Sequence, residues 1–137
     1  MKIAVLIMVI AFMSGCSVTG YQLKDNPSGT YEYTVDENYK KVFRRIVTES
    51  KRCYENGERR VEANIYDDNQ TAEVTLAIVY GGGIQSLYYI EIKAETEFVS
   101  KVRGYYSYNI SNSWKKGVED SEQWASGKLN ICRYKSS

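Results

Sequence analysis

The chain has 137 residues, a formal net charge of +1 and no histidine, and it is 43% hydrophobic and 26% charged. This length suits one domain, and this composition is typical of a globular protein rather than a disordered one. The balanced charge gives no electrostatic surface for nucleic acid, and the missing histidine excludes serine–histidine and cysteine–histidine catalysis and removes the commonest metal ligand.

The first segment of the chain has the layout of an export signal. Lys2 precedes an apolar run over residues 3–12, and Met13-Ser14-Gly15-Cys16 follows. The run has the length of a signal-peptide core and is too short to cross a membrane as a helix. The segment resembles the signal of bacterial lipoproteins, in which an aliphatic residue, two small residues and a cysteine form the lipobox. Met13 stands where leucine is usual.

The resemblance covers residues 1–17 and implies where in the cell the protein is located, not what activity it has. It implies that residues 1–15 are removed and that Cys16 carries fatty acyl chains such as palmitate, which hold a protein stably on a membrane when there are two or more. Ser17, in place of aspartate, implies transfer to the outer membrane, facing the periplasm. An ordinary secretory signal is the alternative. Removing Lys2 with the signal leaves 17 basic and 17 acidic residues.

Lipidation of Cys16 leaves two cysteines, Cys53 and Cys132, in an oxidising compartment. We expect them to form a disulfide across a separation of 79 residues. Cys53 continues the apolar stripe of a predicted helix, which favours a bridge over a solvent-facing thiol. Two buried thiols, or one reactive thiol without an activating histidine, are the alternatives.

Residues 16–29, which are mostly small and polar and contain the only proline, are predicted to be the lipidated N-terminus and a flexible tether. A single domain is expected over 30–137. Residues 30–35 alternate as in a strand, and residues 36–57 have apolar positions at helical spacing, beginning with Tyr39, Val42 and Phe43.

Four further segments alternate as strands, over 59–66, 71–80, 86–95 and 97–108, and the three glycines at 81–83 indicate a hairpin turn. Helical spacing returns over 109–127. The predicted fold class is α+β: an antiparallel sheet of four to five strands with two helices packed on one face, in the order β-α-β-β-β-β-α.

The other face of this sheet is expected to face solvent and to carry the candidate site residues. Glu62, Glu73 and Glu91 fall on it, and two carboxylates at a suitable distance can hydrolyse glycosides when one of them is buried. A solvated charged face is the simpler interpretation. The same face carries a possible partner-binding set: Tyr66, Tyr89, Tyr105, Arg103 and Lys93. Tyrosine also favours strands for structural reasons alone.

We expect a membrane-anchored lipoprotein that is not an enzyme and acts as a binding or accessory module of the cell envelope, through a protein or glycan partner. The alternative is a small envelope hydrolase, or an inhibitor of one, that uses the carboxylates of the sheet face. No cofactor or metal is expected, since Asp67-Asp68-Asn69 lacks the further spaced ligands and the final glutamate of a calcium loop.

Overall fold

The fold is described by a computed structural model over residues 20–107 and 113–133. Its helices and strands follow one another in this order: α1 (Gly20–Asp25), β1 (Gly29–Val35), α2 (Tyr39–Tyr54), β2 (Arg59–Tyr66), β3 (Thr71–Tyr80), β4 (Gly83–Thr96), β5 (Val99–Tyr106) and α3 (Ser113–Ala125). The α+β class and the order predicted for residues 30–137 are confirmed from β1 to α3. Cys16 and the lipobox lie outside the described residues.

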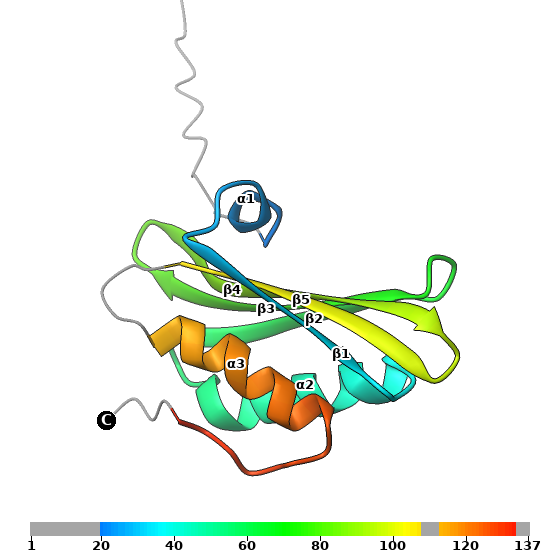
Figure 1. Ribbon diagram of the computed structural model, residues 1–137. Coiled ribbons are helices and arrows are strands. Elements are labelled where there is room, and N and C mark those ends of the chain that lie inside the picture. Colours follow the sequence, from blue (N-terminus) through cyan, green and yellow to red (C-terminus); the bar gives the residue numbers. More distant parts are fainter. Residues whose placement is uncertain (1–19, 108–112, 134–137) are drawn as a thin grey trace, which may run out of the picture.

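The five strands form one antiparallel sheet in the order β1-β5-β4-β3-β2. Strands β2 to β5 form a meander, whereas β1 pairs with the last strand, so the chain crosses the sheet between β1 and β2. Helix α2 makes this crossing, and α3 lies beside it against the same face (Figure 1). The two predicted helices therefore cover one face of the sheet, as expected.

Helix α2 forms where the apolar spacing predicted it. The side chain of Asn38 accepts a hydrogen bond of 2.9 Å from the backbone N–H of Lys40, which caps the first turn. Val42 and Ile46 on its inner side are fully buried. The hydroxyl of Tyr88 on β4 donates a hydrogen bond of 2.7 Å to Ser50, and this contact satisfies a polar group between helix and sheet.

Helix α3 approaches the sheet closely at one glycine. Gly104 on β5 lies directly under Val118, and a Cβ at position 104 would overlap a methyl carbon of Val118. The hydroxyls of Tyr33 on β1 and Ser121 on α3 form a buried hydrogen bond of 2.7 Å close to this contact. The absence of a side chain at Gly104 is what allows α3 to pack at this distance.

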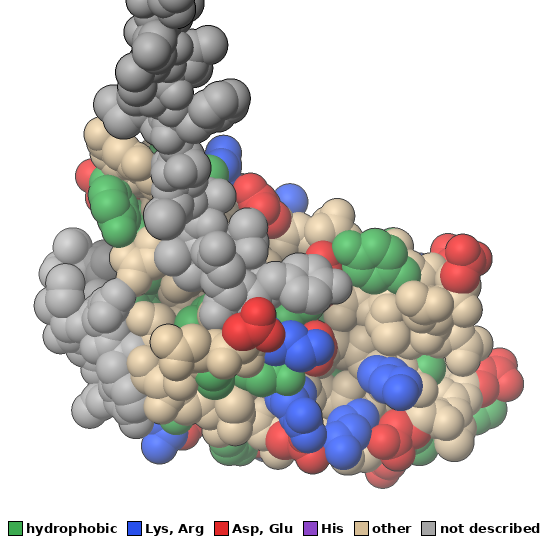
Figure 2. Space-filling model, turned by 90° about the horizontal axis from the view of Figure 1, so that it is seen from above, with side chains coloured by type: hydrophobic (Ala, Val, Ile, Leu, Met, Phe, Trp, Pro, Cys, Tyr) green, Lys and Arg blue, Asp and Glu red, His purple; other side chains and the backbone are tan. Residues whose placement is uncertain are grey.

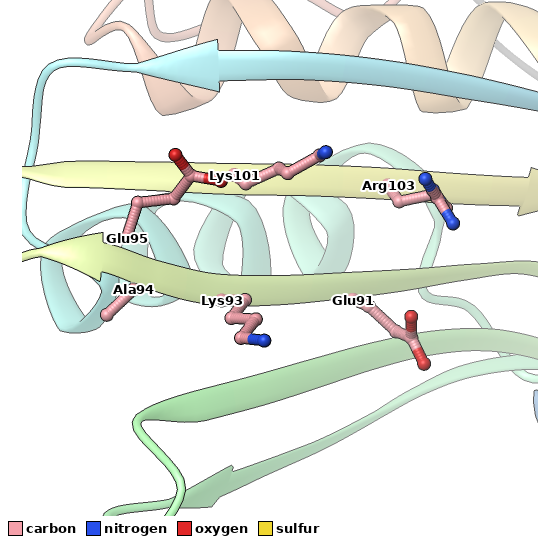
Figure 3. A pocket seen from close by; sticks show the side chains of 6 residues that line it. All are labelled: Glu91, Lys93, Ala94, Glu95, Lys101 and Arg103. Atoms are coloured by element: carbon pink, nitrogen blue, oxygen red, sulfur yellow. The ribbon is translucent and has the colours of Figure 1, made fainter.

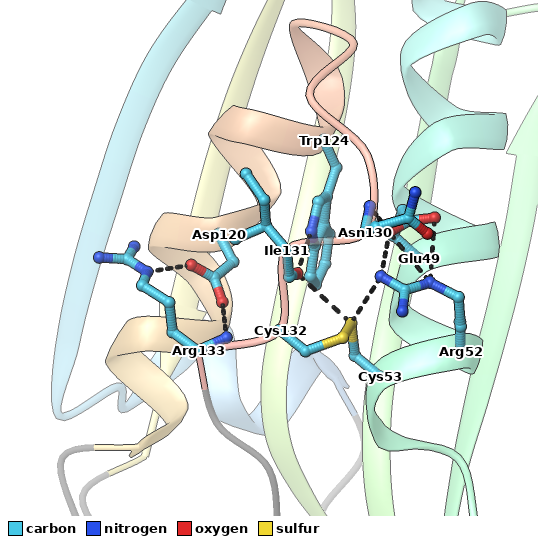
Figure 4. A network of polar contacts seen from close by, with 9 residues as sticks. All are labelled: Glu49, Arg52, Cys53, Asp120, Trp124, Asn130, Ile131, Cys132 and Arg133. Carbon is cyan, nitrogen blue, oxygen red and sulfur yellow. Dashed lines mark hydrogen bonds and ion pairs between the residues drawn. A yellow bond between two sulfur atoms is a disulfide. The ribbon is translucent and has the colours of Figure 1, made fainter.

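The segment after α3 runs back to α2 and is fixed there by a disulfide (Figure 4). Cys53 and Cys132 are bonded, with their Cα atoms 5.5 Å apart, so the predicted disulfide is present in the structure. The indole N–H of Trp124 donates to the carbonyl of Ile131 at 2.7 Å, and Arg133 forms an ion pair with the buried Asp120. These contacts attach the C-terminal segment to both helices.

Helix α1 is the element that the sequence did not predict. It lies within the range 16–29 that was expected to be a flexible tether, and it packs on the sheet face opposite α2 and α3 (Figure 1). Leu23 forms a small apolar cluster there with Tyr89 and Tyr105. The physical reason for the difference is that these two tyrosines offer an apolar surface on which one turn of helix can bury a leucine.

Candidate functional site

The candidate site lies on the face of the sheet that α2 and α3 leave uncovered, which we call the outer face. Strand alternation places Glu73 of β3, Glu91 and Lys93 of β4, and Lys101 and Arg103 of β5 on it. Viewed from the side of α1, this face shows basic and acidic side chains next to one another (Figure 2). The alternation predicted from the sequence is therefore observed.

The five predicted binding residues do not share one environment. Tyr66 is 46% exposed, and Lys93 and Arg103 are exposed as well. Tyr89 and Tyr105 retain only 3% and 6% of their surface, because Leu23 of α1 covers their rings. The expectation that all three tyrosines form an open surface is corrected for these two, which hold α1 in place.

Glu73 is a centre of hydrogen bonding on the outer face. Its Oε1 accepts hydrogen bonds from the hydroxyl of Tyr66 at 2.8 Å and from the side-chain amide of Asn64 at 3.2 Å. Its Oε2 accepts one of 2.7 Å from the hydroxyl of Tyr89. Two of the predicted tyrosines are thus joined through one carboxylate, which fixes the position of both hydroxyls.

Glu91 is the register partner of Glu73 on the neighbouring strand. It forms an ion pair of 2.5 Å with Lys24 of α1. The hydroxyls of Tyr89 and Tyr105 lie 3.5 and 3.4 Å from its two oxygens. The pairing with Lys24 offsets the repulsion between two carboxylates on adjacent strands, and it links α1 to the site.

Basic side chains gather at the β5 side of the outer face. Arg103 donates to Glu32 of β1 at 2.6 Å, and Lys101 pairs with the same carboxylate at 3.1 Å. The hydrogen bonds from Lys101 and Arg103 hold the pKa of Glu32 below its usual value. Lys93 is the register partner of Lys101, so two lysines stand directly opposite one another on this face.

Two grooves are formed by these side chains. The larger, of about 530 Å³, is lined by Glu91, Lys93, Ala94, Glu95, Lys101 and Arg103 (Figure 3). The smaller, of about 340 Å³, is lined among others by Tyr66, Asn69, Thr71, Glu73, Glu91 and Lys93. Because Glu91 and Lys93 line both, the grooves adjoin one another. Pockets of this size range receive small molecules in other proteins.

The three glutamates considered for hydrolysis are only partly brought together. Glu73 and Glu91 line the smaller groove, and each has an oxygen within 3.5 Å of the Tyr89 hydroxyl. Glu62 lines neither groove; its side chain is 58% exposed and pairs with Arg60 at 3.3 Å. Of the three glutamates considered for hydrolysis, Glu73 and Glu91 are therefore close together in one groove, whereas Glu62 is a solvent-exposed side chain outside it.

Several residues of the site were not predicted. The alternation of β3 places Thr71 on the same face as Glu73, so its position in the site could have been predicted. Asn69 lies in the turn just before β3. Glu95 lies next to a register irregularity between Ala94 and Thr96, which alternation alone does not reveal. Leu23 is the one leucine, isoleucine or valine in residues 20–30, and this is the only sequence signal for α1.

Within residues 20–107 and 113–133, no group of three or more acidic, cysteine or histidine side chains is arranged to hold a metal ion. In the same ranges, no helix combines the length and the apolar character needed to cross a membrane.

No protein-family model and no curated protein matches this chain. Solved structures that are similar to it at a low level include the following two. One is the di-domain ARO/CYC protein StfQ of the steffimycin biosynthetic pathway, with a TM-score of 0.38 and 10% identity, covering 72% of this chain and 44% of that one. The other is a TBP-like protein from Parabacteroides distasonis, with a TM-score of 0.34 and 17% identity, covering 63% of this chain and 61% of that one.

The chain thus spans less than two thirds of the length of either similar structure. One of these structures is an ARO/CYC protein, and the expectation that this protein is not an enzyme is withdrawn. The missing histidine excludes histidine-dependent catalysis and no more. A similarity at this level assigns no activity to the chain.

Proposed function

We propose that this protein is a lipid-anchored protein of the bacterial cell envelope that binds a protein or glycan partner on the outer face of its sheet. In this proposal Cys16 is acylated after removal of residues 1–15, and the domain faces the periplasm from the outer membrane. The observation that carries the proposal is the pair of adjoining grooves on the outer face.

The chemistry of the grooves favours recognition of a polar partner. Lys101 and Arg103 supply cations on one side, and Glu73 supplies carboxylate oxygens on the other. The half-exposed ring of Tyr66 adds an apolar surface with a polar tip, which is a frequent element of binding sites. A partner that uses both grooves would meet charged, hydrogen-bonding and aromatic groups within one continuous area.

The position of α1 supports the proposal that the outer face lies close to the membrane. Cys16 precedes Gly20 by four residues, so their Cα atoms are no more than about 14 Å apart however the intervening chain runs. Because α1 packs on the outer face, acyl chains on Cys16 would keep this face near the bilayer. The partner would then be a component of the membrane surface or of the layer next to it.

Capture of partners from envelope extract tests the binding proposal. The full-length protein is compared with Tyr66→Ala and with Tyr80→Ala, a tyrosine that is also exposed and lines neither groove. We expect Tyr66→Ala to lose a partner that the wild type and Tyr80→Ala both retain. Equal recovery of every partner by all three proteins would contradict the proposal.

The anchor is tested separately, by mass spectrometry of the mature N-terminus and by fractionation of a Cys16→Ser variant. We expect an acylated N-terminal Cys16 in the wild type and release of the variant from the membrane. An unmodified peptide that retains Met13 would contradict lipidation and would leave the binding proposal intact.

A second candidate is a small envelope hydrolase that uses Glu73 and Glu91. The specific observation in its favour is that both carboxylates line the smaller groove and contact the same tyrosine hydroxyl. Hydrolysis of envelope glycans by the wild type, abolished by Glu73→Gln and unchanged by Glu62→Gln, is the expected result. Equal activity in the wild type and Glu73→Gln, or no activity in the wild type, would remove this candidate.

A further inference from the structure

Lys93 differs from the other basic residues of the outer face. Lys24 pairs with Glu91, and Lys101 and Arg103 pair with Glu32, whereas Lys93 forms no ion pair with any carboxylate of the described residues. Its side chain is exposed, lines both grooves, and points toward β3 in Figure 3. An exposed lysine at the junction of two grooves is therefore open to a ligand.

The register of the sheet adds a reason for an anion at this point. Lys93 and Lys101 are directly opposite one another on β4 and β5. Like charges in this position destabilise a sheet, and a negative group bound at Lys93 reduces that repulsion. Glu32 reaches Lys101 from β1, on the far side of β5 from Lys93, so it leaves the Lys93 side of the pair uncompensated.

The rest of the smaller groove is suited to a hydroxyl-rich ring. Asn69 and Thr71 offer side chains that can form hydrogen bonds with the hydroxyls of a ligand, and the Glu73 carboxylate adds an acceptor at the same groove. The Tyr66 ring, fixed by its hydrogen bond to Glu73, is half-exposed at the same groove. A sugar ring has one apolar face for an aromatic surface and hydroxyls at its rim, and it matches this combination.

Together, these observations lead to a ligand class. We propose that the smaller groove binds a sugar residue that carries a carboxylate, with its ring on Tyr66, its hydroxyls at Asn69 and Thr71, and its carboxylate at Lys93. This inference rests on the proposed function of the outer face and names the chemistry of the partner: an acidic glycan.

Three probes separate the parts of this proposal in calorimetric titrations of the full-length protein. They are trigalacturonate, the neutral trisaccharide galactotriose, and succinate, which has carboxylates without a sugar ring. We expect trigalacturonate to bind at least about tenfold more tightly than either of the other two, and its affinity to fall as salt is added. Equal affinity for all three, or no binding of trigalacturonate up to about 10 mM, would overturn the proposal.

The variants Lys93→Met and Lys116→Met assign the binding to the groove. Both remove an exposed lysine, and Lys116 lies on α3, away from the outer face. We expect Lys93→Met to weaken trigalacturonate binding about tenfold and Lys116→Met to change it less than about twofold. An equal effect of both would overturn the assignment.

A wrong ligand class and a wrong binding surface give different experimental results. If the wild type does not bind trigalacturonate but Tyr66→Ala still loses an envelope partner, the ligand class is wrong and the outer face remains the binding surface. If Tyr66→Ala recovers every partner and trigalacturonate does not bind, both are wrong. Far-ultraviolet circular dichroism of each variant ensures that only folded proteins are compared.

Discussion

Tyr89 of β4 and Tyr105 of β5 lie side by side under α1, with their ring centroids 5.9 Å apart and their planes inclined by 30°. Leu23 covers the pair, and Lys24 beside it forms an ion pair with Glu91. A helix of six residues is not stable alone in water, so α1 exists because of these contacts. The tyrosine pair thereby determines that the N-terminal part of the described chain is held on the outer face.

The first prediction concerns the cover that α1 forms. Leu23 is the buried apolar side chain among the described side chains of α1, and replacing it by alanine should weaken the attachment of the helix by about 2 kcal/mol. We expect amide hydrogen exchange in residues 20–25 to become about thirtyfold faster, with exchange in β3 and β4 unchanged. The control is Leu129→Ala, because Leu129 is 48% exposed. Unchanged exchange in α1 of the Leu23 variant would contradict this account of its attachment.

The second prediction concerns the contact between α3 and the sheet. Gly104→Ala places a methyl group against Val118 and should lower the free energy of unfolding by about 3 kcal/mol. The double variant with Val118→Ala should recover part of this loss, because it removes the overlapping methyl groups. Gly57→Ala is the control, since a Cβ there meets no atom within 4 Å. Urea unfolding measures the wild type, Gly104→Ala, Val118→Ala, the double variant and the control, and additive losses in the double variant would be evidence against direct contact.

The third prediction concerns the disulfide. The bond between Cys53 and Cys132 closes a loop of 79 residues, and in the chain-entropy model its removal costs about 4.5 kcal/mol. We expect reductant to lower the urea midpoint of the wild type strongly and to leave the midpoint of a Cys53→Ser, Cys132→Ser variant unchanged. A wild-type midpoint that is the same with and without reductant would contradict a stabilising role.

The fourth prediction concerns acid stability at Glu49 of α2, which is buried. Hydrogen bonds from Arg52, at 2.6 Å, and from the backbone N–H of Asn130, at 2.9 Å, lower the pKa of Glu49 in the folded protein. A carboxyl group with a lowered folded pKa stabilises the protein above its unfolded pKa, and this contribution is lost as the pH falls through the folded pKa.

Glu49→Gln should therefore cost about 1 to 3 kcal/mol at pH 7, and the difference from the wild type should shrink as the pH falls below about 4.5. Denaturant unfolding from pH 7 to pH 3 measures this difference, and Glu62→Gln is the control because its side chain is 58% exposed. A difference that is constant over this range would show that the ionised form of Glu49 is not what stabilises the contact.

Much of the fold follows from local periodicity. Tyr39, Val42 and Ile46 repeat at helical spacing, and residues such as Val74 and Ile90 alternate with polar neighbours, so the type of each element from β1 to β5 was predicted. The Cys53–Cys132 bond was predicted from the cysteine count and the stripe of α2. The pairing of β1 with β5 was not predicted, because local patterns do not contain the partner of a strand that lies far away in the sequence.

The parts of the site that were missed depend on contacts between distant residues. The six residues of α1 have too few apolar positions to show a helical period. Leu23 is buried because it packs against Tyr89 and Tyr105, which lie far away in the sequence. Alternation over 97–108 would put Phe98 on the same face as the buried Val102, but Phe98 lies in the turn between β4 and β5, outside both strands, and is 69% exposed. The acceptor role of Glu73 likewise depends on tyrosines from two other strands.

The central claim is that the outer face is the surface through which this protein binds its partner. Photo-cross-linking in intact cells tests it most directly, with a photoreactive amino acid in place of Asn69 at the smaller groove, which leaves Tyr66 intact, or in place of Lys116 on α3. We expect a specific adduct from position 69, competed by trigalacturonate, and none from position 116. Adducts from position 116 alone, or the same adducts from both positions, would contradict it.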